Sequence, residues 1–269
     1  MISEKNRILL QIGNFSFAFL TVIVNALANI IPIGGNLTGD IADSVPNLFV
    51  PTGLTFAIWG VIYVLIILFG FYQFKDIFKK EKENKSYVEK IGAFFILASI
   101  GNITWIFLWH NEQIILSMLP MILLFFSLLM IYQRLEIGKT KIQLKEKIFY
   151  HLPFSVYFGW ITVATVANIT AVLVKINWNG FNISADIWTI LIISIVVFLT
   201  ILILIKRNDF AYSIVIIWAL FGIYLKRMTD DANFGIRENI AYTSLIGILI
   251  IVITAIIIIL YNKKLILKE

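Results

Sequence analysis

The chain contains no cysteine and only two histidines, His110 and His151, among its 269 residues. The absence of cysteine excludes disulfides, thiolate metal sites and cysteine nucleophiles. Two histidines are too few for a histidine-rich metal site. Charged residues are also scarce, at 14%, whereas a soluble domain usually carries about a quarter. We therefore expect no metal site and no cysteine chemistry.

Apolar residues, by contrast, make up 60% of the chain, and the mean hydropathy is +0.92. A single aqueous core cannot bury so much apolar surface, so a soluble enzyme is excluded. The apolar runs are continuous and reach the roughly 20 residues that a helix needs to span a bilayer. The fold class predicted is therefore an all-α polytopic membrane protein. The first run lacks a signal-peptide cleavage pattern, so we expect it to be retained.

Eight runs have spanning length, at about 8–32, 53–73, 90–109, 113–133, 149–174, 186–205, 210–226 and 239–261. Lysine and arginine gather in alternate connections, which lie on the same side of the membrane when all eight runs span it. Only four of the 22 fall on the opposite side: Lys175, Lys226, Arg227 and Arg237. The positive-inside rule then places both termini in the cytoplasm, and loop charge accounts for the net charge of +6 without nucleic acid. We expect an integral protein of a bacterial plasma membrane.

The connection of residues 33–52 becomes external in this topology. It is rich in Gly, Pro, Asn and Asp and carries no Lys or Arg. These residues favour turns, so we expect a structured external lid that is not helical. Asp40 and Asp43 could attract a cation, but isolated carboxylates of this kind are more often solvated turn residues or helix caps.

The polar groups inside the predicted spans are neutral. No Asp, Glu, Lys or Arg lies near the middle of a span, which argues against a proton relay or an ion-coupled pump. One face of the first span carries Gln11, Asn14, Thr21, Asn25 and Asn29, and this face must contact other helices. For Asn25, a hydrogen bond between helices is favoured over a role in a binding site.

The tryptophans differ in depth. Three lie deep in their spans near polar residues, and they are candidates for pocket walls because a buried indole N–H needs a partner: Trp59, Trp105 and Trp160. Three others lie near span ends, where interfacial residues are expected: Trp109, Trp178 and Trp188. The last three spans consist mostly of Ile and Leu. We therefore expect any site in the first five spans, and lipid or a second copy in a homodimer beside the last three.

Three segments resemble the TspO/MBR family, the tryptophan-rich sensory proteins that include the translocator protein or peripheral benzodiazepine receptor. In PTGLTFAIWGVIY, residues 51–63, the spacing of Gly53, Phe56, Trp59 and Tyr63 is similar to the entrance of that family's second helix. The segment GNITWIFLW, residues 101–109, resembles its third helix through Asn102 and Trp105. The segment LPFSVYFGWITVATVAN, residues 152–168, resembles its fifth helix through Trp160 and Asn168.

The resemblance implies a five-helix ligand-binding core in residues 1–174, with three additional helices in 175–269. Members of this family bind tetrapyrroles such as protoporphyrin and haem, and the mitochondrial branch also binds sterols. No cofactor is required. The candidate ligand-binding residues are Phe56, Trp59, Tyr63, Asn102, Trp105, Trp160, Asn168 and Asn25. An apolar cavity with aromatic walls and a few neutral amides suits a flat ligand with polar edges.

The predicted function is binding of a hydrophobic, tetrapyrrole-like small molecule, as a sensor, carrier or regulator. A transporter is the first alternative, since eight spans enclose more volume than five and the polar face of the first span could line a path. A non-catalytic membrane scaffold is the second. Porphyrin degradation has been proposed for the family, but the sequence offers no evident general acid, metal cluster or nucleophile for it. We therefore expect a protein that is not an enzyme.

Overall fold

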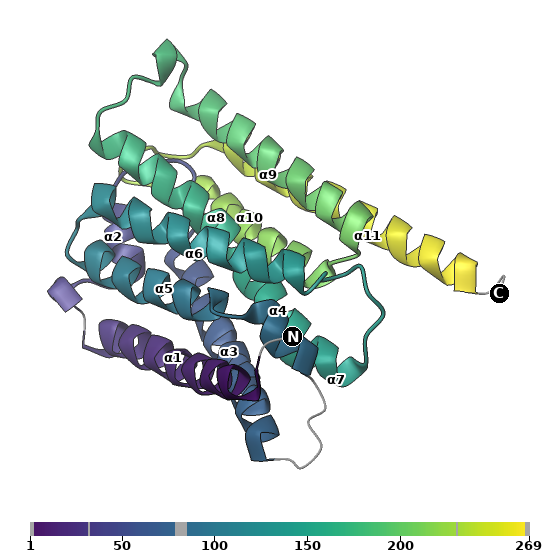
Figure 1. Cartoon of the computed structure of the whole chain (residues 1–269). Coiled ribbons are helices and arrows are strands. Elements are labelled where there is room, and N and C mark those ends of the chain that lie inside the picture. Colours follow the sequence, from purple (N-terminus) through teal and green to yellow (C-terminus); the bar gives the residue numbers. More distant parts are fainter. Residues whose placement is uncertain (1–2, 32, 79–84, 230, 267–269) are drawn as a thin grey trace.

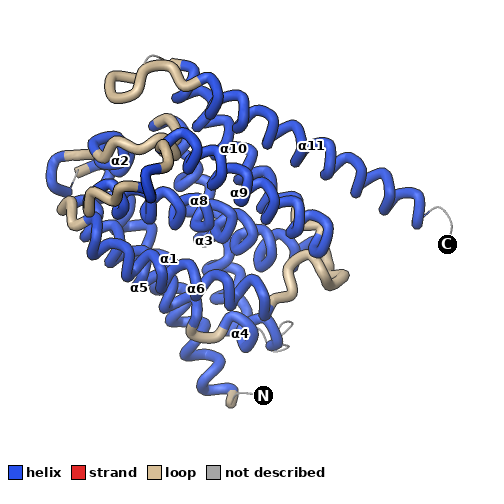
Figure 2. Tube along the Cα trace, turned by 90° about the horizontal axis from the view of Figure 1, so that it is seen from above, coloured by secondary structure: helices blue, strands red, loops and turns tan. Residues whose placement is uncertain are grey.

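The computed structural model describes residues 3–31, 33–78, 85–229 and 231–266, and within these residues the regular structure is helical (Figures 1 and 2). The long helices are α1 Glu4–Ile30, α3 Ile58–Lys75, α5 Phe94–His110, α6 Ile114–Arg134, α8 Leu152–Lys175, α9 Ala185–Arg207, α10 Phe210–Met228 and α11 Glu238–Ile266. Shorter helices are α2 Thr38–Ser44, α4 Lys85–Ile91 and α7 Leu144–Glu146. Single turns complete the order: η1 Ile33–Gly35, η2 Gly53–Ala57, η3 Asp76–Phe78, η4 Lys147–His151 and η5 Gly180–Asn182.

Each of the eight predicted spans contains one long helix. Seven of these helices are long and apolar enough to cross a membrane. The eighth, α5, has 17 residues, at the short end of the range of about 17 to 25 residues that spans a bilayer. The prediction of an all-α polytopic membrane protein is thereby confirmed.

The third predicted span, 90–109, begins later than expected. Gly92 has a φ of +55°, a conformation that glycine adopts without steric cost. The chain therefore turns between α4 and α5, and α5 begins at Phe94. The apolar residues before Gly92 belong to α4, which packs beside α1 and α6. Hydropathy cannot distinguish such a turn from a continuous helix.

Five helices form a closed ring. Around this ring α1 packs against α3, α3 against α8, α8 against α6, α6 against α5, and α5 again against α1. Outside the ring α10 packs along α8, and α9 and α11 pack on α10 and on each other (Figure 1). One continuous core of buried apolar residues runs from Ala18 to Ile251. The division of the chain into a five-helix core, residues 1–174, and three additional helices, residues 175–269, therefore stays a prediction, since no gap in the apolar core separates the two parts.

The connections lie at two opposite ends of the bundle (Figure 1). We call one the lid end; of the described residues it holds 31, 33–57, 111–113, 176–184, 229 and 231–237, and it includes α2. We call the other the basic end; of the described residues it holds 76–78, 85–93, 135–147 and 208–209, with both ends of the described chain. At the lid end, ion pairs join Asp43 of α2 to Lys226 of α10, and Arg237 to Asp186 in the first turn of α9.

At the basic end, Tyr87 of α4 donates its hydroxyl to Glu146 of α7 at 3.1 Å. Burial and the charge of Glu146 raise the pKa of Tyr87 to about 12. This end carries the described members of the predicted cytoplasmic set of lysines and arginines. Lys79, Lys80, Lys82 and Lys268 belong to the same set but lie outside the described residues. Which end faces the cytoplasm stays a prediction.

The turn between α9 and α10 is built from two consecutive capping residues. Asn208 ends α9 in the left-handed conformation, at φ +53°, which Asn tolerates better than most residues. Asp209 then caps α10, because its Oδ1 accepts the backbone N–H of Tyr212 at 3.2 Å. The turn thus buries a carboxylate at the basic end, where Asp209 is 5% exposed.

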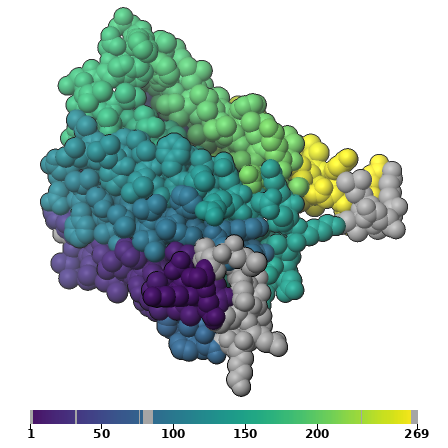
Figure 3. Space-filling model, viewed as in Figure 1, coloured from purple at the N-terminus to yellow at the C-terminus, as the bar shows by residue number. Residues whose placement is uncertain are grey.

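The outermost helix, α11, exposes much of its apolar surface, including Ile253, Ile257 and Leu260. Its C-terminal part extends beyond the rest of the molecule (Figure 3). A helix of 29 residues is about 43 Å long, which exceeds the hydrocarbon core of about 30 Å. Such a surface requires a lipid environment. A homodimer through this face stays a prediction.

Candidate ligand pocket

Four indoles from three helices gather inside the five-helix ring. The ring of Trp59, on α3, stacks near that of Trp105 at 6.2 Å between centroids and meets Trp160 edge-on at 6.1 Å. On α5, Trp105 stacks on Trp109 at 5.4 Å. All four are at least nine-tenths buried. Pairs at these separations and angles are favourable beyond the area that they bury, so the cluster is a preformed aromatic surface.

Hydrogen bonds hold two of these indoles in place. The indole N–H of Trp105 donates to Oδ1 of Asn168 at 2.9 Å, and Nδ2 of Asn168 donates to Ser117 Oγ at 3.1 Å. Trp109 donates its N–H to the backbone carbonyl of Thr38 at 3.1 Å. Nε1 of Trp160 is buried and has no hydrogen-bond partner among the described residues. The pocket wall therefore includes one free donor, which is costly to bury.

Helix α8 contributes a wall of small side chains. Ala164, Ala167 and Ala171 line the pocket together with Trp160 and Asn168. Their spacing of three or four residues places them on one helical face. Alanines at these positions leave the space into which the indoles of α3 and α5 project.

The lid over the pocket is partly helical, so the prediction of a non-helical 33–52 segment is wrong. Thr38–Ser44 forms α2, in which the Asp40 carboxylate accepts the N–H of Leu37 at 3.2 Å. The Gly and Asp residues that suggested a turn instead begin a short helix. Thr38 Oγ1 contacts Nε2 of His110 at 2.9 Å, which holds this helix against the end of α5.

The lid closes the pocket tightly. Ala42 of α2 and the following residues Asn47, Val50 and Pro51 form its roof. The remaining cavity has a volume of about 40 Å³. Pockets for drug-sized ligands are typically roughly 300 to 1,000 Å³. A tetrapyrrole therefore requires displacement of the lid or of the indoles.

The structure brings together five of the eight predicted ligand-binding residues; those that line the pocket are Phe56, Trp59, Trp105, Trp160 and Asn168. Tyr63 lies behind the wall and stacks on Trp59 at 5.7 Å. Asn25 and Asn102 lie away from the cavity and bind each other, Nδ2 to Oδ1, at 2.6 Å. For Asn25 this is the interhelical bond that the sequence favoured.

Sequence reasoning placed Trp109 incorrectly. Its position near a span end suggested an interfacial residue, but it is 5% exposed and lines the pocket. The lid covers this end of α5, so the end of the helix is not the surface of the protein. The spacing of four residues from Trp105 is the signal that could have identified it, because it places both indoles on one face. Trp178 and Trp188 are partly exposed at the lid end.

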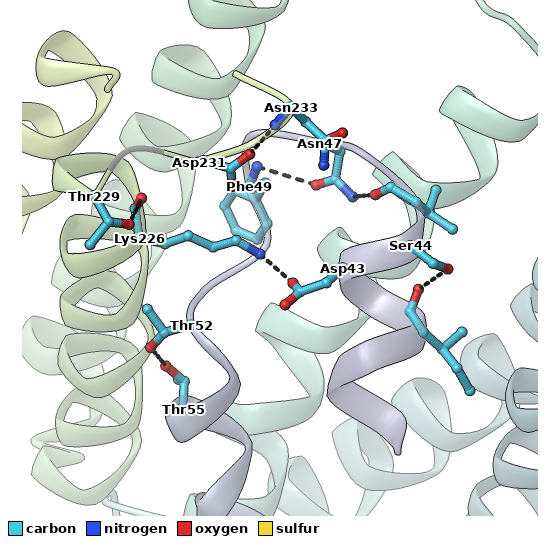
Figure 4. A network of polar contacts seen from close by, with 12 residues as sticks. Asp43, Ser44, Asn47, Phe49, Thr52, Thr55, Lys226, Thr229, Asp231 and Asn233 are labelled. Carbon is cyan, nitrogen blue, oxygen red and sulfur yellow. Dashed lines mark hydrogen bonds and ion pairs between the residues drawn. The ribbon is translucent and has the colours of Figure 1, made fainter. Parts of the chain in front are cut away.

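A polar network connects the lid to α10 beside the pocket (Figure 4). Lys226 of α10 forms an ion pair with Asp43 of α2, and Asn47 accepts the N–H of Phe49 at 3.2 Å. Of the two lid carboxylates, Asp43 thus pairs with lysine and Asp40 caps a helix. Helix α10 therefore contributes to holding the lid in place.

A second cavity of about 190 Å³ lies within this network and shares Ala42, Asn47 and Val50 with the tryptophan pocket. Its wall includes Arg227, whose side chain is fully buried. Nη2 of Arg227 pairs with Asp231 at 3.3 Å, while its Nε and Nη1 have no hydrogen-bond partner among the described residues. Guanidinium donors are therefore free next to the aromatic pocket.

The geometry agrees with the comparison with known families. The chain matches the family of TSPO-like proteins over residues 11–257, a range that extends through α9 and α10 into α11. Neither a curated protein nor a solved structure gives a significant match. The match covers most of the 269 residues, and it agrees with the three resembling segments. This chain belongs to the TSPO-like family of integral membrane proteins.

Proposed function

We propose that the protein binds a flat, largely apolar small molecule of the tetrapyrrole class in the tryptophan pocket, and that it acts as a sensor, carrier or regulator without converting the ligand. The observation that carries this proposal is the convergence of four indoles from α3, α5 and α8 on one cavity beneath the lid. Aromatic faces stack on an extended π-system, and the alanines of α8 give it room. Membership of the TSPO-like family supports the same ligand class.

Two polar features support a ligand with acceptor groups at its edge. The free N–H of Trp160 can donate to a ligand oxygen or nitrogen. The free guanidinium donors of Arg227 lie in the adjoining cavity, and guanidinium groups bind carboxylates strongly. A molecule with an apolar body in the first cavity and an acidic edge in the second would satisfy both. Tetrapyrroles with carboxylate side chains have this form.

The proposal includes opening of the lid, because the closed cavity of about 40 Å³ cannot hold such a molecule. Between α2 of the lid and α10, Lys226 with Asp43 is the ion pair among the described residues. An ion pair of partly exposed groups contributes about 1 kcal/mol or less. Its loss is therefore a modest cost that ligand stacking can offset.

The test is a titration of tryptophan fluorescence with protoporphyrin in detergent, for the full chain and for Trp59→Leu. Loss of one stacking indole removes about 0.5 to 1.5 kcal/mol, so we expect a dissociation constant about two- to twelvefold higher. Trp178→Phe is the matched control, since Trp178 lies at the same end but outside this pocket. No saturable quenching, or an equal loss in both variants, would overturn the proposal.

Two further measurements refine the ligand class and the role. The dimethyl ester of protoporphyrin lacks the carboxylates, so we expect it to bind more weakly than the free acid, with the difference reduced in Arg227→Gln. The absorption spectrum of the recovered ligand should be unchanged after incubation, and a changed spectrum would contradict binding without conversion. Saturable counterflow of the ligand in proteoliposomes would replace the sensor or regulator role with transport.

A further inference from the structure

A separate and larger cavity lies at the basic end, between the 137–144 connection, the start of α8 and the start of α10. Its volume is about 690 Å³, within the range of roughly 300 to 1,000 Å³ typical of ligand pockets. None of its lining residues belongs to the tryptophan pocket at the other end of the bundle. It is therefore a separate cavity with its own lining residues.

The wall of this cavity is mostly apolar and reaches the surface. Its apolar side chains come from all three segments: Ile142, Leu144, Ile148, Leu152 and Phe210. Leu144 is 72% exposed and Ile148 is 39% exposed. Exposed aliphatic residues next to lysines are typical of the boundary between the hydrocarbon and the headgroups of a bilayer.

Three basic side chains line the same cavity. Lys141 and Lys147 are exposed and form no ion pair within the described part of the chain. His151 is 5% exposed, and its Nε2 has no hydrogen-bond partner among the described residues. The π-helical turn η4 carries Lys147, Ile148 and His151, all of which line the cavity. A buried imidazole with a free Nε2, beside two exposed ammonium groups, is a set of donors for an anion.

The acidic groups nearby already have partners. Asp209 is the single carboxylate among the described lining residues. It accepts hydrogen bonds from Ser155 Oγ at 2.6 Å, from the hydroxyl of Tyr132 at 2.8 Å and from the N–H of Tyr212 at 3.2 Å. Glu146, on the adjoining turn, accepts from Tyr87. The donors that remain free in the cavity are therefore basic.

We propose that this cavity binds one anionic phospholipid, with its phosphate at Lys141, Lys147 and His151 and an acyl chain along Ile148, Leu152 and Phe210. Basic pockets between transmembrane helices bind anionic headgroups in this way. An apolar wall next to a basic rim favours such a lipid over a free phosphate ion, which would use the basic rim alone. The proposal does not depend on the ligand of the tryptophan pocket.

The experiment measures thermal stability of the full chain in a neutral detergent with dioleoyl phosphatidylglycerol. Dioleoyl phosphatidylcholine carries the same chains on a zwitterionic headgroup, and inorganic phosphate carries the anion alone. We expect a saturable rise in melting temperature with phosphatidylglycerol, a much smaller rise with phosphatidylcholine and none with phosphate. Native mass spectrometry should show a single retained phosphatidylglycerol.

Two charge-matched double variants locate the effect. Lys141→Gln with Lys147→Gln removes two charges from the cavity, and we expect at least a tenfold weaker response to phosphatidylglycerol. Lys139→Gln with Lys206→Gln removes two exposed charges from the same end but outside the cavity, and should respond as the parent does. Ile148→Trp keeps the lysines and fills the apolar wall, so it should also lose the response.

Three results would overturn the proposal. Equal loss in both double variants would mean general attraction to a basic surface. An equal response to phosphatidylcholine would mean that the headgroup charge is not recognised. Stabilisation by phosphate alone, unaffected by Ile148→Trp, would mean a free anion site without a lipid chain.

Discussion

At the scale of single residues, the buried amides of α1 connect helices. Nε2 of Gln11 donates to the backbone carbonyl of Gln73 at 3.1 Å, and Asn14 donates to the side chain of Gln73 at 3.0 Å. Asn25 donates to Asn102 at 2.6 Å. The spacing of these residues correctly predicted one face turned toward other helices. It could not identify their partners, since Gln73 and Asn102 lie on helices whose approach depends on the whole bundle.

Asn102→Ala should therefore lower stability without weakening ligand binding. The substitution removes one interhelical hydrogen bond, worth about 0.6 kcal/mol in a membrane bundle, and leaves the amide of Asn25 without this partner. Unfolding in detergent with increasing dodecyl sulfate measures the change. Asn29→Ala is the control, because Asn29 is exposed and bonds only within α1 among the described residues. If Asn102→Ala weakens protoporphyrin binding as much as Trp59→Leu, Asn102 belongs to the binding site after all.

At the scale of elements, α10 approaches the entrance of α3 closely enough to require glycine. A Cβ at Gly222 would overlap Thr55 Oγ1 and lie 2.9 Å from Cβ of Pro51. The carbonyl of Gly222 accepts the N–H of Thr52 at 3.2 Å, and Trp218 donates its indole N–H to the carbonyl of Thr55 at 2.9 Å. These contacts join α10 directly to residues 51–55, which connect the lid to α3.

Gly222→Ala should separate α10 from this segment. The overlap forces a local shift that typically costs about 1 to 3 kcal/mol, and we expect a lower melting temperature together with a changed affinity for protoporphyrin. Gly60→Ala is the matched control, since a Cβ at that helical glycine meets no atom within 4 Å. An unchanged melting temperature in Gly222→Ala would show that the two segments are not held as closely as described.

Much of the helical layout followed from the sequence, whereas the lid did not. Continuous apolar runs are sufficient to predict long helices, because lipid requires the backbone to satisfy its own hydrogen bonds. The turn at Gly92, the helix Thr38–Ser44 and the burial of Trp109 depend on local capping and on contacts distant in sequence. Five pocket residues were predicted because three tryptophans lie deep in their spans and because three segments resemble the motifs of the TspO/MBR family. The lid residues Ala42 and Asn47 were missed because no periodicity marks them.

At the scale of the whole molecule, charge is distributed between the two ends. The basic end carries Lys139 and Lys147 together with most of the described lysines, whereas the lid end has Lys175 and a few paired cations. Positively charged connections remain preferentially in the cytoplasm during insertion. The bundle should therefore be oriented with its lid outside, and a ligand should reach the tryptophan pocket from that side.

The absence of cysteine makes this orientation directly measurable. In intact cells, a membrane-impermeant maleimide should label Lys175→Cys at once. It should label Lys139→Cys only after the membrane is permeabilised. Both positions are exposed lysines, so the two variants differ mainly in the end of the bundle that they report. Labelling of Lys139→Cys in intact cells would place both termini outside and reverse the predicted topology.

Helix α8 forms part of the wall of the tryptophan pocket near Asn168 and, through its first residues and the preceding turn η4, part of the wall of the basic-end cavity. A rigid-body shift or rotation of this helix changes both cavities together. Occupants that favour different positions of α8 are thermodynamically linked, and each changes the affinity of the other by the same factor. If a phospholipid occupies the basic-end cavity as proposed, the lipid composition of the membrane changes the affinity of the tryptophan pocket for its ligand, and an affinity measured in lipid-free detergent differs from that in the membrane.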